Sequence, residues 1–209
     1  MKNAIWYSRV IWSPIILFLA GIRFQVIEKA PIDYSKSFIY VSNHESLLDI
    51  PVVSYAVKKN LSFVAKKELK KVPFLGWFML AVGTILVDRF NKKQAMISFQ
   101  KAGEQINQGN SVISFAEGTR TKTGEMGFFK RGSFLIAQQG KVDIIPLCIK
   151  GTREVNPSGK FEINGGKVQI MIGEVIKSEP WFDKDPDLFA KHVENIVRDM
   201  RKELDATFN

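Results

Sequence analysis

The stretch SFIYVSNHESLLDIPVV, residues 37–53, combines a strand, a polar break and the start of a helix. Residues 37–41 are rich in β-branched and aromatic side chains, which favour a strand. Asp49, followed by Pro51, is typical of a helix N-cap with proline in the first helical turn. The stretch therefore predicts a strand that leads through a short loop into a helix, and His44 lies in that loop.

The same alternation continues along the chain, as in βαβ units. Further strands are expected at residues 23–31, 61–65, 84–89, 111–117 and 143–151, and helices at 50–59, 74–81, 92–109, 132–140 and from Asp185 onward. Residues 161–173 are expected to form a hairpin around Asn164 and Gly165. The sequence thus predicts an α/β fold with a mixed, largely parallel central sheet flanked by helices, preceded by an N-terminal helical membrane-interface motif.

Length and composition indicate one folded domain. The 209 residues, 45% of them hydrophobic, can bury a substantial core. We divide the chain into an N-terminal segment, residues 1–23, and an α/β domain, residues 24–209. The single cysteine, Cys148, excludes an internal disulfide, and with only two histidines no metal site is expected.

The formal charge of +9 predicts an anionic partner, which could be nucleic acid, an anionic membrane surface or a phosphorylated substrate. Lysines at positions 58, 59, 66, 67, 70 and 71 lead into the apolar stretch PFLGWFMLAVG. Basic residues beside aromatic ones suit a water–lipid interface better than a DNA groove, so we expect no nucleic acid. The alternative is a solvated, lysine-rich turn before a buried helix.

The N-terminus raises the same question of lipid contact. The uncharged residues 10–22 would form a helix of about 20 Å, too short for a hydrocarbon core of roughly 30 Å. No small-residue cleavage site of a secretory signal follows. With Trp6, Tyr7 and Trp12 nearby and Pro14 to bend it, the segment is expected to lie in one leaflet. The alternative is a helix packed on the domain's own core.

The spacing of His44 and Asp49 also requires a break in the chain. On one continuous helix, an offset of five residues would place the two side chains roughly 140° apart. A carboxylate beside a histidine fixes one ring nitrogen and leaves the other to take a proton from a hydroxyl. The chain has no G-x-S-x-G motif, and Cys148 lies within an apolar strand, so we expect the nucleophile to belong to the substrate.

Polar residues follow the expected strands, where ligands of open α/β sheets bind. After the strand at 111–117, Gly118, Thr119 and Arg120 could share the oxygens of a phosphate. Arg89, at the end of TILVDR, could add a second positive charge. Glu117 would repel a phosphate, so we expect it to hold an arginine or a substrate hydroxyl. The alternative is an ordinary glycine turn with surface salt bridges.

Four motifs in order resemble the blocks of the glycerolipid acyltransferase family. They are NHESLLD (43–49), GTILVDR (83–89), FAEGTRT (115–121) and IIPLCIKG (144–151). The stretches AKKELKKVPFLGW and FFKRG are also similar to that family. Within it, the resemblance is closest to the bacterial enzymes that acylate 1-acylglycerol 3-phosphate, also called lysophosphatidate.

The resemblance implies transfer of an acyl group from a thioester to the sn-2 hydroxyl of lysophosphatidate, which gives phosphatidate. Acyl carrier protein or coenzyme A would carry the acyl group as co-substrate, with no acyl-enzyme, cofactor or metal. The enzyme would act at the cytoplasmic face of the cell membrane, as a monotopic or peripheral protein on the lipid bilayer. The nearer alternative is a related enzyme acting on glycerol 3-phosphate or another lysolipid, and the distant one is a basic membrane-surface or nucleic-acid-binding protein without catalysis. By the family pattern, His44 is the general base and Asp49 orients it, while Arg89, Glu117, Gly118, Thr119, Arg120 and Lys130 bind the glycerol phosphate.

Overall fold

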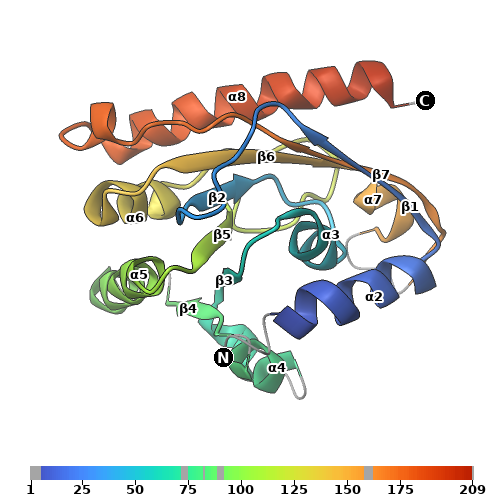
Figure 1. Cartoon of the computed structure of the whole chain (residues 1–209), viewed down its shortest axis with the longest axis horizontal. Coiled ribbons are helices and arrows are strands. Elements are labelled where there is room, and N and C mark those ends of the chain that lie inside the picture. The colour runs from blue at the N-terminus through green and yellow to red at the C-terminus, as the bar shows by residue number, and fades with distance from the viewer. Residues whose placement is uncertain (1–5, 72–74, 82, 89–91, 158–161, 209) are drawn as a thin grey trace.

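The computed structural model describes residues 6–71, 75–81, 83–88, 92–157 and 162–208. These residues form a seven-stranded sheet in the order β1-β7-β6-β2-β5-β3-β4, with helices on both faces (Figure 1). The strands are β1 (Ile22–Glu28), β2 (Ile39–Ser42), β3 (Leu61–Lys66), β4 (Ile85–Val87), β5 (Ser111–Phe115), β6 (Ile144–Lys150) and β7 (Gly166–Ile172).

The helices follow the expected alternation, with some short additions. The α-helices are α2 (Ser13–Leu19), α3 (Asp49–Ala56), α4 (Leu75–Ala81), α5 (Lys92–Asn107), α6 (Gly132–Gly140), α7 (Thr152–Val155) and α8 (Pro186–Thr207). A π-helical turn, η1 (Ser8–Trp12), precedes α2, and 3-10 turns form η2 (Lys67–Lys71) and η3 (Glu179–Trp181). Local sequence patterns do not predict α7 or η3, whereas η2 coincides with the lysine-rich turn stated as an alternative.

Strand direction confirms the predicted mixed, largely parallel sheet. Five of the six neighbouring pairs are parallel, and only β6 and β7 run antiparallel among the described strands. Because β2 lies between β5 and β6 and runs parallel to both, the segments that follow these three strands emerge at one edge of the sheet.

The core has two layers because successive strand residues point to opposite faces. In β2, Ile39 and Val41 pack with α5, α6 and α8 on one face, whereas Tyr40 packs with α2 and α3 on the other. The central strands β2, β5 and β6 are therefore mostly apolar and almost fully buried, as expected for a sheet covered on both sides. This buried frame fixes the positions of the loops at the strand ends.

The hairpin expected at residues 161–173 is wrong for the described part. Glu162, Ile163 and Asn164 have no regular secondary structure. The strand after them, β7, pairs with β1 and β6 instead. The Asn-Gly signal competes here with pairing across the sheet, because the Gly166 N–H donates to the carbonyl of Gly21 just before β1. Tertiary pairing outweighs the local turn preference.

Asp49 is not the N-cap that the sequence predicts. Leu48 occupies that position, and Asp49 is the first residue of α3. The Asp49 carboxylate accepts the backbone N–H groups of Glu45 and Ser46, which precede the helix, rather than those of its first turn. The helix also ends at Ala56, before the expected residue 59.

The N-terminal segment has one buried and one exposed face. Ser13, Leu17 and Ala20, spaced for one side of a helix, are buried on the core that contains α3. Phe18, on the other side, is 82% exposed. The expected helix is present, and one side of it packs on the domain's core, which was the alternative to a segment lying in one leaflet. Contact with lipid stays a prediction. Within the described ranges, no helix combines the length and apolar character needed to cross a membrane.

Candidate active site

The structure brings together His44 and Asp49. His44 follows β2, and its Nδ1 lies 2.7 Å from Asp49 Oδ2 at the start of α3. The loop between them provides the break that the five-residue spacing requires. In the tautomer that donates the Nδ1 proton to Asp49, Nε2 is the ring nitrogen that can accept a proton.

The Asp49 carboxylate is fully buried, and both of its oxygens accept hydrogen bonds. Oδ2 accepts the N–H groups of Glu45 at 2.7 Å and Ser46 at 3.0 Å, besides the His44 ring. Oδ1 accepts the hydroxyl of Thr152 at 2.5 Å. A buried carboxylate costs least when its oxygens are satisfied in this way. These bonds fix the position of Asp49 and, through it, the histidine ring.

The His44 ring also rests on an aromatic surface. Its plane stacks on the Phe115 ring at the end of β5, with the ring centres 4.1 Å apart and the planes inclined by 11°. The stack and the Asp49 hydrogen bond restrain the ring from different directions. Phe115 is missing from the residues that sequence reasoning selected, although it opens the third motif.

Among the described residues, Glu117 accepts hydrogen bonds from two backbone N–H groups, and not from the arginine that was one of its expected partners. Its two oxygens accept the N–H groups of His44 at 2.7 Å and Gly127 at 2.8 Å. Burial raises the pKa of the Glu117 carboxyl, and these two N–H donors oppose the shift. Glu117 thereby joins the end of β2 to the loop that follows the third motif.

Gly118, Thr119 and Arg120 form a turn beside His44. Gly118 has a φ of 74°, a left-handed conformation that favours glycine. Its N–H already donates to the Phe115 carbonyl, so the residue supplies backbone shape rather than that donor. Thr121 N–H donates to the His44 carbonyl at 2.9 Å, which holds the turn against the histidine.

Lys130 and Arg89, the other two candidate residues, are not shown at the site. Lys130 is exposed, and its backbone N–H donates to the Ala116 carbonyl at 2.9 Å. Its side chain is not among those that line the cavity described next. Arg89 lies outside the described residues, so its predicted role stays a prediction.

A cavity of about 460 Å³ opens beside the histidine, within the size range of ligand sites. His44, Gly118, Thr119 and Arg120 line it together with the basic residues Arg9, Lys59 and Lys66. Its other walls are mostly apolar and come from the N-terminal segment, α3, β3 and α4; they include Trp12, Ile50, Leu61, Phe63 and Met79. The arrangement places a proton acceptor and cationic groups on the walls of a largely apolar space that suits an aliphatic chain.

Two further polar residues secure the histidine loop, which we define as residues 43–49. Asn43 bridges to β6, where its side chain accepts the Ile149 N–H at 2.8 Å and donates to the Ile149 carbonyl at 2.9 Å. Thr152 comes from α7, just beyond the fourth motif. Sequence reasoning assigned neither residue to the site, although Asn43 adjoins His44 and Thr152 adjoins IIPLCIKG.

Cys148 is a buried thiol in β6, in agreement with its expected structural role. Burial raises its pKa to about 12, which disfavours the nucleophilic thiolate. Within the described part of the chain, no cluster of three or more His, Cys, Asp or Glu side chains could hold a metal ion.

Comparison with known proteins identifies the family. The Acyltransferase family model matches residues 22–150, more than half of the chain and the region that contains His44, Asp49 and the Gly118–Arg120 turn. The chain belongs to this acyltransferase family. Thr152 lies just beyond the matched region.

Named relatives and a solved structure agree with this assignment. A 1-acyl-sn-glycerol-3-phosphate acyltransferase of Saccharomyces cerevisiae is 30% identical over 95% of this chain and 66% of its own length. The Pseudomonas aeruginosa protein of the same name is 31% identical over 85% of this chain and 65% of its own. This chain thus spans less than two thirds of the length of either relative.

The solved structure is the 1-acyl-sn-glycerophosphate (LPA) acyltransferase PlsC of Thermotoga maritima. It superimposes on this chain with a TM-score of 0.75 at 30% sequence identity. The match covers 98% of this chain and 79% of the PlsC chain. The fold of this acyltransferase, including its N-terminal helical segment, therefore matches that of a named family member.

Proposed function

We propose that this acyltransferase transfers an acyl group from a thioester to the sn-2 hydroxyl of 1-acylglycerol 3-phosphate, giving phosphatidate. The thioester is carried by acyl carrier protein or coenzyme A. The observation that carries the proposal is the His44–Asp49 pair, 2.7 Å apart, whose histidine lies on the wall of a largely apolar cavity. The names of the yeast, Pseudomonas and Thermotoga relatives support this choice of acceptor.

In the proposed reaction, His44 Nε2 takes the proton of the acceptor hydroxyl as its oxygen attacks the thioester carbonyl carbon. Through its hydrogen bond at Nδ1, Asp49 stabilises the imidazolium that forms when Nε2 is protonated. The tetrahedral intermediate collapses with cleavage of the carbon–sulfur bond, and the proton passes from Nε2 to the leaving thiolate. The substrate hydroxyl is the nucleophile, so the scheme needs no acyl-enzyme, cofactor or metal.

The phosphate of the acceptor is proposed to bind at the turn beside His44. The Arg120 guanidinium offers paired N–H donors to phosphate oxygens, and the Thr119 hydroxyl can add one more. Gly118 lets the turn form, and Glu117 fixes the backbone on which it is built. Arg89 and Lys130 complete the proposed basic set, the latter from an exposed position.

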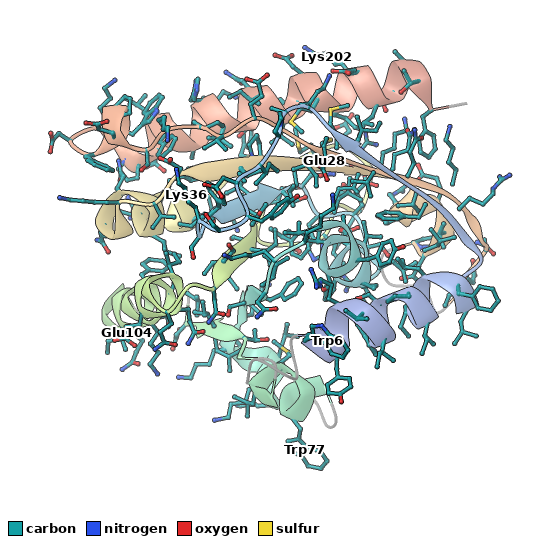
Figure 2. All side chains as sticks on the ribbon, in the orientation of Figure 1. Trp6, Glu28, Lys36, Trp77, Glu104 and Lys202 are labelled. Carbon is teal, nitrogen blue, oxygen red and sulfur yellow. The ribbon has the colours of Figure 1, made fainter. Side chains whose placement is uncertain are left out.

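We also propose that the protein rests on the cytoplasmic face of a membrane through its N-terminal segment and α4. Trp6 and Trp77 lie on the same side of the molecule, away from α8 (Figure 2). Trp77 is 68% exposed, and Phe18 even more so. Exposed aromatic and aliphatic side chains next to the lysines of η2 suit a lipid–water interface with anionic headgroups.

The test is an acyl-transfer assay on purified protein that crosses two donors with two acceptors. The donors are acyl carrier protein and coenzyme A thioesters, and the acceptors are lysophosphatidate and glycerol 3-phosphate. We expect phosphatidate from lysophosphatidate and little product from glycerol 3-phosphate. Preferential acylation of glycerol 3-phosphate would assign the chain to a different acceptor, and no transfer with any pair would refute the proposal.

A further inference from the structure

A buried ion pair links the C-terminal helix to the histidine loop. Glu45, the residue directly after His44, is only 2% exposed. Its Oε1 accepts a hydrogen bond from Nη1 of Arg201 in α8. The Arg201 Nε also donates to Asp205 at 3.1 Å. One side chain of α8 therefore reaches across to the loop that carries the proposed base.

Arg201 contacts the histidine loop by a second route. Its Nη1 lies 3.3 Å from the Ile149 carbonyl oxygen, the same oxygen to which Asn43 donates. Arg201 therefore meets Glu45 directly and Asn43 through a shared acceptor. Glu45 in turn uses its backbone N–H to hold Asp49 Oδ2 at 2.7 Å. The path from Arg201 to the His44 ring consists of buried or half-buried contacts throughout.

The charges around Glu45 explain why it needs this partner. Asp49 in α3 and Glu154 in α7 both act on Glu45 as like charges, while Arg201 acts as the opposite charge. On α8, Asp205 draws on the same guanidinium and on Lys150 of β6. Without Arg201, the buried Glu45 carboxylate next to Asp49 would lose its counter-charge. Either the loop would have to move, or Glu45 would have to take up a proton.

Stability alone does not account for such a pair. A buried ion pair loses hydration on both charges, so a well-packed apolar pair is often at least as stable. What arginine adds is geometry, since its planar guanidinium directs several N–H donors along fixed lines. Here the Arg201 guanidinium donates to the Glu45 carboxylate, the Ile149 carbonyl and the Asp205 carboxylate.

We propose that Arg201 is a positioning residue for acyl transfer: through Glu45 it holds the histidine loop so that Asp49 stays aligned with the His44 ring. The inference rests on the proposed function, in which that alignment creates the base. Arg201 itself touches no substrate in this account. It lies beyond the region that the family model matches, in a helix that otherwise covers the sheet.

Turnover provides the first test. Arg201→Met should lower kcat at least tenfold and leave the KM for lysophosphatidate within about twofold, because the phosphate turn is untouched. Arg201→Lys should recover part of the loss. The matched control is Lys202→Met, which removes a neighbouring exposed charge that pairs with Asp199. It should behave as wild type.

A double variant tests the route through Glu45. If Arg201 acts through Glu45, then Arg201→Met combined with Glu45→Gln should be no slower than the slower single variant. Effects that multiply would mean that the two residues act independently and would overturn the proposal. So would a kcat of Arg201→Met equal to that of wild type. If Arg201→Met fails to melt cooperatively, Arg201→Lys and Glu45→Gln carry the same test.

A spectroscopic readout separates this inference from the proposed function. The chain has two histidines, and His192 is exposed on α8, so the imidazole NMR signals can be assigned to each. We expect a downfield Nδ1–H proton signal from His44, bound to Asp49, in wild type and Lys202→Met, and its loss in Arg201→Met. An unchanged signal in Arg201→Met would refute positioning whatever reaction the protein catalyses, whereas a lost signal in a protein without acyl transfer would refute only the proposed function.

Discussion

The histidine loop and the N-terminal segment differ in which side chains they bury and which they expose. In the loop, residues 43–49, buried polar groups meet defined partners, as in the three hydrogen bonds at Asp49 Oδ2. In the described part of the N-terminal segment, residues 6–23, large apolar side chains such as Phe18 lie exposed. Proton transfer depends on fixed geometry, whereas contact with lipid depends on apolar area. Single substitutions should therefore have large effects in the loop and graded effects in the segment.

The largest effect is expected at Asp49. Asp49→Asn removes the negative charge and leaves one acceptor oxygen for the ring N–H and the two backbone N–H groups. The ring therefore loses its tautomer and its orientation. We expect kcat to fall by roughly 10²- to 10⁴-fold, the range for loss of general-base catalysis. The control is Asp199→Asn, at an exposed carboxylate on α8. A kcat for Asp49→Asn within threefold of wild type would show that the fixed loop geometry is not what catalysis needs.

The N-terminal segment should respond through membrane binding. Burying one large apolar side chain contributes about 1.5–3 kcal/mol, so Phe18→Asp should weaken binding to anionic vesicles roughly tenfold or more. Ile15→Asp should add a further loss. Binding should weaken with salt yet persist, because the apolar contact remains.

Leu188→Asp, at an exposed leucine on α8, is the matched control and should bind vesicles normally. Activity of Phe18→Asp on a short-chain acceptor dissolved in water should equal that of wild type. Vesicle binding by Phe18→Asp and Ile15→Asp at the wild-type level would remove the membrane role and leave the segment as core packing alone. Substitution is preferable to deletion because Leu17 and Ala20 are buried and Trp12 lines the cavity.

A smaller effect is expected at Thr152, which supplies a single bond to the loop. A hydrogen bond to a charged group contributes about 1.5–3 kcal/mol. Thr152→Val should lower kcat by about tenfold, and Thr152→Ser, which keeps the hydroxyl, should restore most of it. Steady-state kinetics on soluble acceptor measure both. Equal impairment of the two variants would assign Thr152 a role in packing instead.

The smallest effect concerns pH and Glu45. Burial, offset in part by Arg201, raises the pKa of Glu45 from 4.5 to about 7. The folded state therefore holds a proton that the unfolded state has released, and stability from this group is present below pH 4.5 and is lost as the pH rises through about 7. Over that window, the free energy of unfolding of wild type should fall relative to that of Glu45→Gln.

Urea midpoints measured at pH 5 and pH 8 test this expectation. Arg201 stays charged throughout, since its pKa is raised further above its usual value by Glu45 despite burial, so Glu45 is the member of the pair that titrates. An identical pH dependence in wild type and Glu45→Gln would mean that Glu45 keeps an ordinary pKa.

Local sequence patterns predict most of the fold. The strands and long helices follow from side-chain periodicity, and Asp185 caps α8 as its sequence indicates, accepting the Asp187 N–H at 2.9 Å. Patterns fail where another hydrogen-bond partner competes. The Asn164–Gly165 signal yields to pairing of β7 with β1, and the Asp49 side chain turns back to the loop instead of capping α3.

The candidate site divides in the same way. His44, Asp49 and the Gly118–Arg120 turn stand out because polar residues end apolar strands. Arg201 and Glu45 are 156 residues apart, and no short-range pattern connects them. Glu117 shows a further limit, because its residue type suggests an ion pair while its surroundings give it two backbone N–H groups. Partners such as these are set by the tertiary fold.

Whether His44 acts as the base of a direct transfer is tested by single-turnover acyl transfer by wild type, His44→Ala and Cys148→Ser, with intact-protein mass spectrometry of each quenched reaction. We expect wild type and Cys148→Ser to form phosphatidate with no mass added to the protein. His44→Ala should be slower by roughly 10²- to 10⁴-fold while retaining its cooperative melt. An acylated protein intermediate that turns over at the catalytic rate, or a fully active His44→Ala, would contradict the account.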